Sequence, residues 1–508
     1  MSVVIAIDAG TTGVRSFALR PDGTPAGYAY REFPQHFPSP GLVEHDPDDI
    51  WAATEATLAE LVGRLDGEAV AAVGITNQRE TAVVWDRRTG RPLHRALVWQ
   101  DRRTAARCDE LREAGHLDLV RRTTGLVLDP YFSATKLEWL LTHGGVDAGP
   151  DLAFGTVDSW ILWNLTGGAS GGVHATEASN ASRTMLFDIS ALAWSSELLD
   201  LFGVPESCLP EVRPSGGLFG RTVPGTPLPA GVPVAGVLGD QQAALFGQAC
   251  LEPGLTKNTY GTGSFVLMNV GDRCPDPAPG LLTTVAWTGL DTGAGSHPVT
   301  GSATVATYAL EGSIFATGAA VQWLRDGLGV IGSSAEMGPL AESCADTEGV
   351  YMVPAFTGLG SPWWDPYARG TVVGITRGTT AAHLARAAVE AMAFQTRDVV
   401  EAMASASGQT IAELRIDGGA SVMDLLVQVQ ADQLQVPVAR PVLQETTAVG
   451  AAYLAGLSEG VWGSVDDVAS RWRLERRCEP AATRAEVDAR HGRWRQAVER
   501  SRGWALDR

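Results

Sequence analysis

Three short glycine turns carry the residue types that bind a phosphate chain. They occupy residues 8–15 (Asp-Ala-Gly-Thr-Thr-Gly-Val-Arg), 261–264 (Gly-Thr-Gly-Ser) and 417–420 (Asp-Gly-Gly-Ala). Glycine lets backbone amides approach a phosphate closely, and threonine and serine add hydroxyl donors. One such turn alone is more typical of a hairpin, but each of the three follows an apolar run with the pattern of a strand. Together they predict a nucleotide site divided between two domains.

Asp8 ends the first apolar run, where a carboxylate can hold a magnesium ion through the water shell of the ion. The chain has no GxxxxGK[ST] motif, so a Walker-type phosphate loop is excluded. It has only two lysines, Lys136 and Lys257, and neither follows a glycine. Any function that needs a specific lysine therefore has two candidates.

The overall charge limits the classes of partner. The 508 residues include 39 basic and 58 acidic side chains, a net charge of -19, which disfavours nucleic acid and anionic membranes as partners. No apolar run reaches the roughly 18 residues of a membrane span, and the N-terminus lacks the pattern of a signal peptide. Six scattered cysteines without a CxxC pair are typical of reduced thiols. We therefore expect a cytoplasmic protein.

The elements that must position the turns follow an α/β pattern. Residues 3–7 form an apolar run, a glycine turn follows, and residues 16–19 return. Residues 257–268 repeat this strand, turn, strand design about 250 positions later. The repeat predicts two domains of related architecture that face each other. The Glu-Pro-Gly break at 252–254 places the boundary between domains 1–251 and 252–508.

Further elements follow from periodicity and capping signals. A strand at 233–238 ends at Gly239 and Asp240, and a strand at 414–417 leads into the third glycine turn. The Ala/Gly-rich helix at 446–457 is suited to close packing. Helices are predicted at 47–65, 241–250, 308–326, 381–406 and 446–457, and a surface helix in the tail after residue 474.

Seven longer segments are specific enough to indicate a family. They lie at residues 41–47, 74–81, 98–101, 129–136, 180–185, 239–247 and 358–366, and 239–247 reads Gly-Asp-Gln-Gln-Ala-Ala-Leu-Phe-Gly. Through them the chain resembles the FGGY carbohydrate kinases of the actin, hexokinase and sugar-kinase superfamily, from the first strand to about Trp462. The resemblance implies an α/β fold of two actin-like (ribonuclease H-like) domains that face each other across a catalytic cleft. The first domain would bind the alcohol and the second the nucleotide.

The same resemblance implies ATP-dependent phosphorylation of glycerol to sn-glycerol 3-phosphate. Asp240 would be the general base. A triol offers donors and acceptors but no charge, so a guanidinium, two carboxylates, a phenol and an amide can satisfy its hydroxyls and penalise an analogue lacking one. The implied glycerol site contains Arg79, Glu80, Tyr131, Asp240 and Gln241 as hydrogen-bonding groups, with Trp99 and Phe265 as an apolar wall.

The implied cofactor is Mg²⁺ with ATP. Asp8 would hold the metal through water, and Arg15 would help neutralise the phosphoryl charge. Two departures from the family pattern bear on nucleotide affinity: Met423 stands where asparagine is usual, with Asp424 as a candidate replacement, and the first turn lacks a usual glutamine and serine. The implied nucleotide contacts are Thr11, Thr12, Gly13, Arg15, Gly261, Thr262, Gly318, Gln322, Gly419 and Met423.

Two alternatives stay open beside the glycerol-phosphorylating enzyme. One is an FGGY kinase of another small polyol or ketose, and the residue set around Arg79 and Tyr131 argues against it. The other is a polyol sensor that binds without turnover, against which the presence of Asp8 and Asp240 argues. The expected partners are glycerol and ATP, with no nucleic acid and no integral membrane. The family implies a homodimer or homotetramer.

Overall fold

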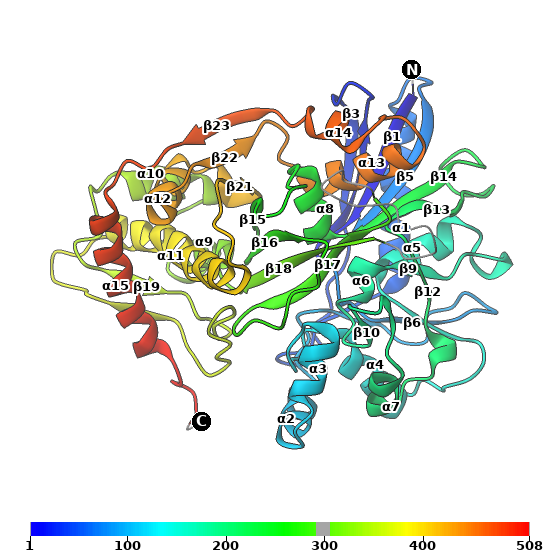
Figure 1. The fold of residues 1–508 in the computed structure, drawn as a ribbon, viewed down its shortest axis with the longest axis horizontal. Coiled ribbons are helices and arrows are strands. Elements are labelled where there is room, and N and C mark those ends of the chain that lie inside the picture. Colours follow the sequence, from blue (N-terminus) through cyan, green and yellow to red (C-terminus); the bar gives the residue numbers. More distant parts are fainter. Residues whose placement is uncertain (1, 291–304, 507–508) are drawn as a thin grey trace.

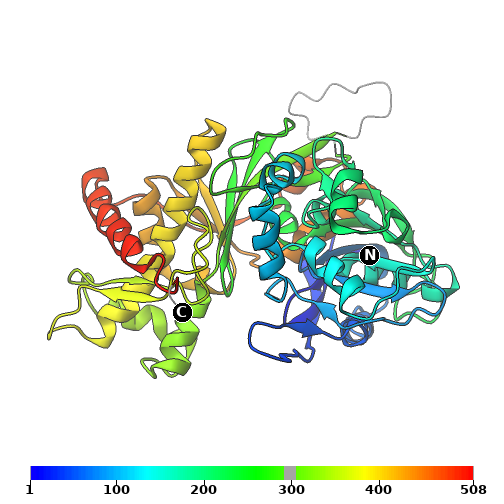
Figure 2. The same ribbon diagram turned by 90° about the horizontal axis from the view of Figure 1, so that it is seen from below.

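The computed structural model describes residues 2–290 and 305–506. The chain forms two lobes, each built around one large mixed sheet (Figures 1 and 2). The first lobe has a six-stranded sheet in the order β13-β14-β5-β1-β2-β3, and the second has a seven-stranded sheet in the order β17-β18-β16-β15-β21-β22-β23. The predicted α/β fold with two sheet-containing domains is confirmed.

In the first lobe, three parallel strands form the centre of the sheet. β1 (Ser2–Ala9) pairs in parallel with β5 (Ala69–Asn77), which pairs in parallel with β14 (Pro233–Gly239). The remaining strands of the sheet are antiparallel: β2 (Gly13–Leu19), β3 (Pro25–Glu32) and β13 (Gly216–Arg221). The main helices are α1 (Pro47–Gly63), α5 (Val157–Leu165) and α8 (Asp240–Gly247).

Smaller elements extend the first lobe away from its sheet. Short strands pair two by two, for example β6 with β8, and short helices pack around a separate apolar cluster. These elements are β4 (Glu44–His45), β6 (Val83–Asp86), β7 (Ala96–Leu97), β8 (Leu152–Gly155), β9 (Ala175–Glu177), β10 (Phe187–Asp188), β11 (Ala193–Trp194), β12 (Glu211–Arg213), α2 (Ala105–Glu113), α3 (Leu117–Thr124), α4 (Ser133–Thr142), α6 (Ala178–Ala181) and α7 (Ser196–Phe202).

The second lobe repeats the central arrangement of the first. β15 (Thr256–Tyr260), β21 (Leu414–Asp417) and β22 (Val438–Pro441) are parallel, and β16 (Ser264–Gly271) returns antiparallel to β15. The predicted strand, turn, strand repeat is therefore present. The other elements are β17 (Leu282–Thr288), β18 (Ala306–Ile314), β19 (Tyr351–Val353), β20 (Thr371–Val373), β23 (Leu474–Cys478), α9 (Gly318–Gln322), α10 (Met337–Glu342), α11 (Ala381–Ser407), α12 (Asp424–Leu434) and α15 (Arg484–Ser501). The short helix α14 (Val465–Ala469) lies instead beside the strands of the first lobe (Figure 1).

The helix predicted at 308–326 is wrong in its first half. Residues 308–314 belong to β18, which lies inside the seven-stranded sheet with all its residues buried, whereas Gly318–Gln322 is α-helical and Trp323–Gly327 continues it as a wider π-helical turn. A strand buried on both faces has no polar alternation, so periodicity cannot distinguish it from a buried helix. The tail after residue 474 begins with the edge strand β23, and the helix predicted there follows at Arg484–Ser501.

One late helix returns to the first lobe. α13 (Thr446–Ser458) packs against β1, β5, β14 and α8, and Figure 1 shows it in orange among the blue strands. Its glycines permit the close packing expected: a methyl group at Gly450 would overlap the carbonyl oxygen of Ala243 on α8. The domain division at residues 251 and 252 stays a prediction.

Candidate active site

Chemically active side chains gather where the parallel strands of the first lobe end. Ala9, Asn77 and Gly239 are paired in register as the last residues of β1, β5 and β14. The residues that follow β5 and β14 in the chain therefore emerge at one edge of the sheet. Arg79 and Glu80 come after β5, and Asp240 comes after β14. This is the edge at which open α/β sheets bind their ligands.

These residues line a small chamber between the lobes. Its volume is about 140 Å³, below the roughly 300 Å³ at which pockets for drug-sized ligands begin. The chamber brings together every predicted glycerol contact and part of the predicted nucleotide set. Its lining residues are Thr11, Arg79, Glu80, Trp99, Tyr131, Asp240, Gln241, Thr259, Gly261, Thr262, Gly263 and Phe265.

Asp240 is held in place through one of its carboxylate oxygens. Its Oδ1 lies 3.1 Å from Arg79 Nε and accepts a hydrogen bond from the backbone amide of Gln241 at 2.7 Å. Burial raises the pKa of Asp240, while Arg79 and Lys257 oppose that rise. An oriented carboxylate that faces a small chamber can accept a proton from a bound hydroxyl.

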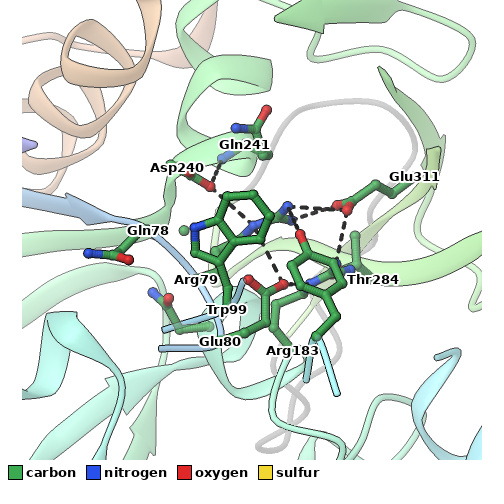
Figure 3. Close-up of polar contacts among 12 residues, drawn as sticks. Gln78, Arg79, Glu80, Trp99, Arg183, Asp240, Gln241, Thr284 and Glu311 are labelled. Atoms are coloured by element: carbon green, nitrogen blue, oxygen red, sulfur yellow. Dashed lines mark hydrogen bonds and ion pairs between the residues drawn. The ribbon is translucent and has the colours of Figure 1, made fainter. Parts of the chain in front are cut away.

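Behind Arg79 lies a buried network of alternating charges (Figure 3). Glu311, on β18 of the second lobe, accepts hydrogen bonds from Arg79 at 2.6 and 3.1 Å and from Arg183 at 2.9 Å. Arg183 also donates to Glu80 at 2.7 Å. The two guanidinium groups hold the pKa of Glu311 down at about 2 despite burial. The network fixes two predicted glycerol contacts and ties them to the other lobe.

Glu311 and Arg183 have no predicted role in the sequence, although Arg183 lies in a segment that indicates the family. Glu311 is not identified as a site residue from the sequence, because the pattern predicts a helix over residues 308–326. The buried glutamate in an otherwise apolar run was the available signal, since a lone buried carboxylate needs a cationic partner.

The backbone at Glu80 is in the left-handed region, with φ at 61°. Such a conformation is uncommon for a residue with a side chain, and it persists where surrounding contacts determine it. Here Ser133 Oγ donates to the Glu80 carbonyl at 2.9 Å, and Arg183 holds its carboxylate. The turn aims the Glu80 side chain into the site rather than along the strand.

Aromatic rings form one wall of the chamber. Trp99 meets Tyr131 and Phe265 edge to face, with ring centroids 5.6 and 6.3 Å apart. Trp99 Nε1 also donates to Thr11 Oγ1 at 2.9 Å, so the predicted apolar wall touches the first phosphate turn. A wider apolar space of about 280 Å³ adjoins the chamber, with Phe315 and Phe356 in its lining.

Each of the first two glycine turns is closed by a backbone hydrogen bond between its own residues. Gly10 N donates to Gly13 O at 3.0 Å, and Gly261 N donates to Gly263 O at 2.8 Å. A Cβ at Gly13 would lie 2.5 Å from Arg31 O, so only glycine fits. Thr12 and Thr262 are exposed beside these turns. Backbone and hydroxyl donors are thus presented by both lobes toward the cleft.

Arg15 and Asp8 face each other on paired strands. The two residues are in register between β1 and β2, and Arg15 Nη1 lies 3.7 Å from Glu445. Burial and the charge of Asp240 raise the pKa of Asp8 to about 7, against the opposing effect of Arg15. A carboxylate with a raised pKa is stabilised as an anion by a nearby cation. Its oxygen donors suit magnesium, which needs few protein ligands because it keeps several waters.

The structure does not bring all predicted nucleotide residues into the chamber. Gly318 begins α9 and donates its amide to Gly261 O at 3.0 Å, whereas Gln322 and Gly419 are exposed farther along the second lobe. Met423 packs partly against the core of that lobe. Asp424, the candidate replacement for the usual asparagine, pairs with Arg440 at 3.3 Å and Arg476 at 2.6 Å.

Comparison with known proteins identifies the family to which the chain belongs. Residues 3–247 match the N-terminal domain of the FGGY family of carbohydrate kinases, and residues 256–459 match its C-terminal domain. The chain belongs to this family. The matched segments of this FGGY kinase contain every strand end and glycine turn described above.

Individual relatives of this FGGY kinase are similar over nearly their whole length. Glycerol kinases from Trichlorobacter lovleyi and Chromobacterium violaceum are 54% and 52% identical, with 99% of this chain and at least 99% of each relative covered. The crystal structure of Plasmodium falciparum glycerol kinase with ADP superposes with a TM-score of 0.89 at 32% identity, covering 99% of this chain and 98% of that one. The two lobes therefore have the actin-like fold of sugar kinases.

No helix among residues 2–290 and 305–506 combines the length and apolarity needed to cross a membrane. Within the same residues, no cluster of three or more His, Cys, Asp or Glu side chains could hold a metal ion unaided.

Proposed function

We propose that this chain transfers the γ-phosphoryl group of ATP to a primary hydroxyl of glycerol, giving sn-glycerol 3-phosphate, as a glycerol kinase. The observation that carries the proposal is the shared chamber. It places a potential base, Asp240, and the polyol-binding groups Arg79 and Tyr131 beside the phosphate-turn residues Thr11 and Thr262. Full-length relatives described as glycerol kinases support the same substrate.

The linings of the two spaces favour a three-carbon alcohol. Any part of a pentulose or longer polyol that reached into the adjoining space would lie beside Phe315 and Phe356. Hydroxyl groups placed there would lose hydrogen bonds to water without finding partners, which costs free energy. Glycerol would keep all three hydroxyls near the polar groups of the chamber.

The proposed reaction is an in-line displacement. The attacking hydroxyl oxygen forms a bond to the γ-phosphorus as the bond from that phosphorus to the bridging β-phosphate oxygen breaks, and ADP leaves. The hydroxyl proton passes to Oδ2 of Asp240. Arg79 holds the other oxygen at 3.1 Å and keeps the carboxylate aimed at the hydroxyl. Closure of the lobes would exclude water, which competes as a phosphoryl acceptor.

Residues on both lobes would bind the nucleotide. The turns at Gly13 and Gly261 would supply backbone donors, the hydroxyls of Thr12 and Thr262 would add to them, and Arg15 would offset phosphate charge. Bound magnesium supplies charge neutralisation on the phosphate oxygens. Asp8 would hold the metal through its water shell.

Initial rates of ADP release across a panel of polyols and ketoses with magnesium ATP test the substrate. We expect release that depends on glycerol, with weak responses to tetritols and pentuloses. A stronger response to another polyol or a ketose would identify the first alternative. Tight glycerol binding without ADP release would identify a non-catalytic sensor.

Asp240→Asn tests the base. The amide cannot accept the proton, so we expect turnover to fall by roughly 10²–10⁴-fold, with an unchanged melting temperature. Asp200→Asn, at an exposed position on α7, is the matched control and should keep wild-type turnover. Near-normal turnover in a folded Asp240→Asn protein would contradict the assignment.

Four related points stay predictions: the division of roles between residues 1–251 and 252–508, the use of Mg²⁺ with ATP, a cytoplasmic location, and a homodimer or homotetramer. Gel filtration with light scattering gives the oligomeric state, and omission of magnesium from the ADP-release assay tests the metal.

A further inference from the structure

Lys257 is fully buried at the junction of the lobes. It lies on β15 of the second lobe, and its Nζ contacts three oxygens: Gln241 Oε1 at 2.5 Å, Thr259 Oγ1 at 2.8 Å and the Phe265 carbonyl at 3.2 Å. Gln241 belongs to α8 of the first lobe, so this ammonium links the two lobes beside the chamber.

The hydrogen-bonding capacity of Lys257 is used completely by neutral groups. An ammonium has three N–H donors and no acceptor, and three oxygens occupy them. Among the described residues, no carboxylate lies within 4.0 Å of it. Burial of a cation without an ion pair is costly, so its position calls for a role in the site.

The ammonium decides the orientation of the Gln241 side-chain amide. An amide can present either its oxygen or its NH₂ group, but only the oxygen can face three N–H donors. With Oε1 occupied by Lys257, the NH₂ group is the end left for a ligand. Gln241 lines the chamber directly beside Asp240 (Figure 3).

We propose that Lys257 is a positioning residue that fixes Gln241 as a hydrogen-bond donor to the alcohol held by Asp240. The inference rests on the proposed function and refines it. A hydroxyl that gives its proton to Asp240 has lone pairs to spare, and the Gln241 NH₂ group can donate to one of them. Lys257, Gln241 and Asp240 thus set the polarity of one hydroxyl position.

A direct contact between Lys257 and the transferred phosphoryl group is the competing role. It is disfavoured because all three donors already have partners, and a phosphate would have to displace one of them. The two roles differ in what a substitution affects. A positioning role changes glycerol binding through Gln241, whereas a phosphate contact changes the nucleotide step whatever residue stands at 241.

A double-mutant cycle separates these roles. Lys257→Met, Gln241→Leu and the double variant are compared for glycerol Kd by calorimetry, KM for glycerol, kcat and KM for magnesium ATP. We expect each single variant to weaken glycerol binding about tenfold, the effect of roughly one hydrogen bond, with KM for magnesium ATP within about twofold of wild type. In the Gln241→Leu background, Lys257→Met should add less than about twofold.

Equal effects of Lys257→Met in both backgrounds, or a main effect on kcat and KM for magnesium ATP, would overturn the proposal. Gln241→Glu provides a test that leaves Lys257 in place. The carboxylate would pair with Lys257 but cannot donate, so the melting temperature should hold while glycerol affinity falls about tenfold. Gln241→Met, which is neutral, should show the same loss. Wild-type glycerol affinity in both would also overturn the proposal.

The wild-type measurements keep this inference separate from the proposed function. Wild-type protein that binds glycerol but releases no ADP would disprove the kinase proposal, while the cycle on glycerol Kd would still test Lys257. Wild-type protein that binds no glycerol would overturn both.

Discussion

Asp240 and Gln241 are adjacent in the chain but offer opposite hydrogen-bonding groups to one small chamber. Asp240 accepts, with Arg79 holding one of its oxygens at 3.1 Å. Gln241 donates, because its amide oxygen is occupied by Lys257. Matching a hydroxyl in this way requires fixed orientations, which Arg79 gives to Asp240 and Lys257 gives to Gln241.

The protonation of Lys257 makes glycerol binding depend on pH. Burial lowers the pKa of Lys257 to about 8; Asp417 on β21, Asp240 on α8 and Glu311 on β18 oppose this, and Arg79 after β5 adds to it. As pH rises through about 8 the ammonium becomes an amine, which can also accept a hydrogen bond, so the Gln241 amide is no longer held. KM for glycerol should therefore rise between pH 7 and 9.5.

Two variants serve as controls for the pH dependence. Lys257→Met should show a flat KM for glycerol over this range. Lys136 is a suitable control because burial lowers its pKa to about 8 as well. It donates to the carbonyls of Tyr131 and Phe132 and not to Gln241, so Lys136→Met should keep the wild-type rise in KM. If the rise in KM disappeared in Lys136→Met and persisted in Lys257→Met, the pH dependence would arise from Lys136 and the prediction for Lys257 would be wrong.

At the scale of elements, the site depends on strand ends and on close contact between helices. β1, β5 and β14 end in one row, which places Asp8, Arg79 and Asp240 at one edge. α8 begins at that edge with Asp240 and lies against α13 from the far end of the chain. A methyl group at Gly450 on α13 would overlap the Ala243 carbonyl of α8.

Gly450→Ala should force α13 away from α8 and cost about 1–3 kcal/mol of unfolding free energy. Urea denaturation measures the loss, and kcat should fall as well because α8 carries Asp240. Gly63→Ala, at the end of α1 with no atom near the added methyl group, is the matched control and should be neutral or slightly stabilising. Equal stability of the two variants would mean that the helix contact tolerates a side chain.

At the scale of the whole molecule, the two lobes meet through charge as well as through packing. Glu311 comes from the sheet of the second lobe and is gripped by Arg79 and Arg183 of the first. Lys257 also crosses this junction, because it belongs to the second lobe and donates to Gln241 of the first. Two charged residues of the second lobe therefore hold first-lobe side chains in place at the proposed alcohol site.

Glu311→Gln should weaken both stability and glycerol use. It leaves two buried guanidinium groups short of negative charge, so we expect a loss of about 3 kcal/mol or more and at least a tenfold lower kcat/KM for glycerol. Binding of magnesium ADP, measured by calorimetry, should change little.

Glu475→Gln is the control for this prediction. It removes a partly exposed pair with Arg440 inside the second lobe and should cost less than about 1 kcal/mol. Unchanged kcat/KM for glycerol in Glu311→Gln would show that the ion pairs of Glu311 with Arg79 and Arg183 are not needed to position the site residues.

Much of the protein follows from the sequence by itself. Local rules account for the glycine turns at Gly13 and Gly263, the repeat of strand, turn and strand, and the capping of α1 by Asp46. The family segments indicated Asp240 and the surrounding polyol contacts. These features are local because turn conformation, capping and strand propensity depend on neighbouring residues.

Only the tertiary structure decided which distant residues complete the site. Glu311 lies 232 positions from Arg79, and its stretch was predicted as a helix because a strand buried on both faces shows no alternation. Lys257 was one of two lysines without a role until β15 placed it against Gln241. Partners of buried charges are set by how sheets and lobes pack, and neighbouring residues carry no information about that packing.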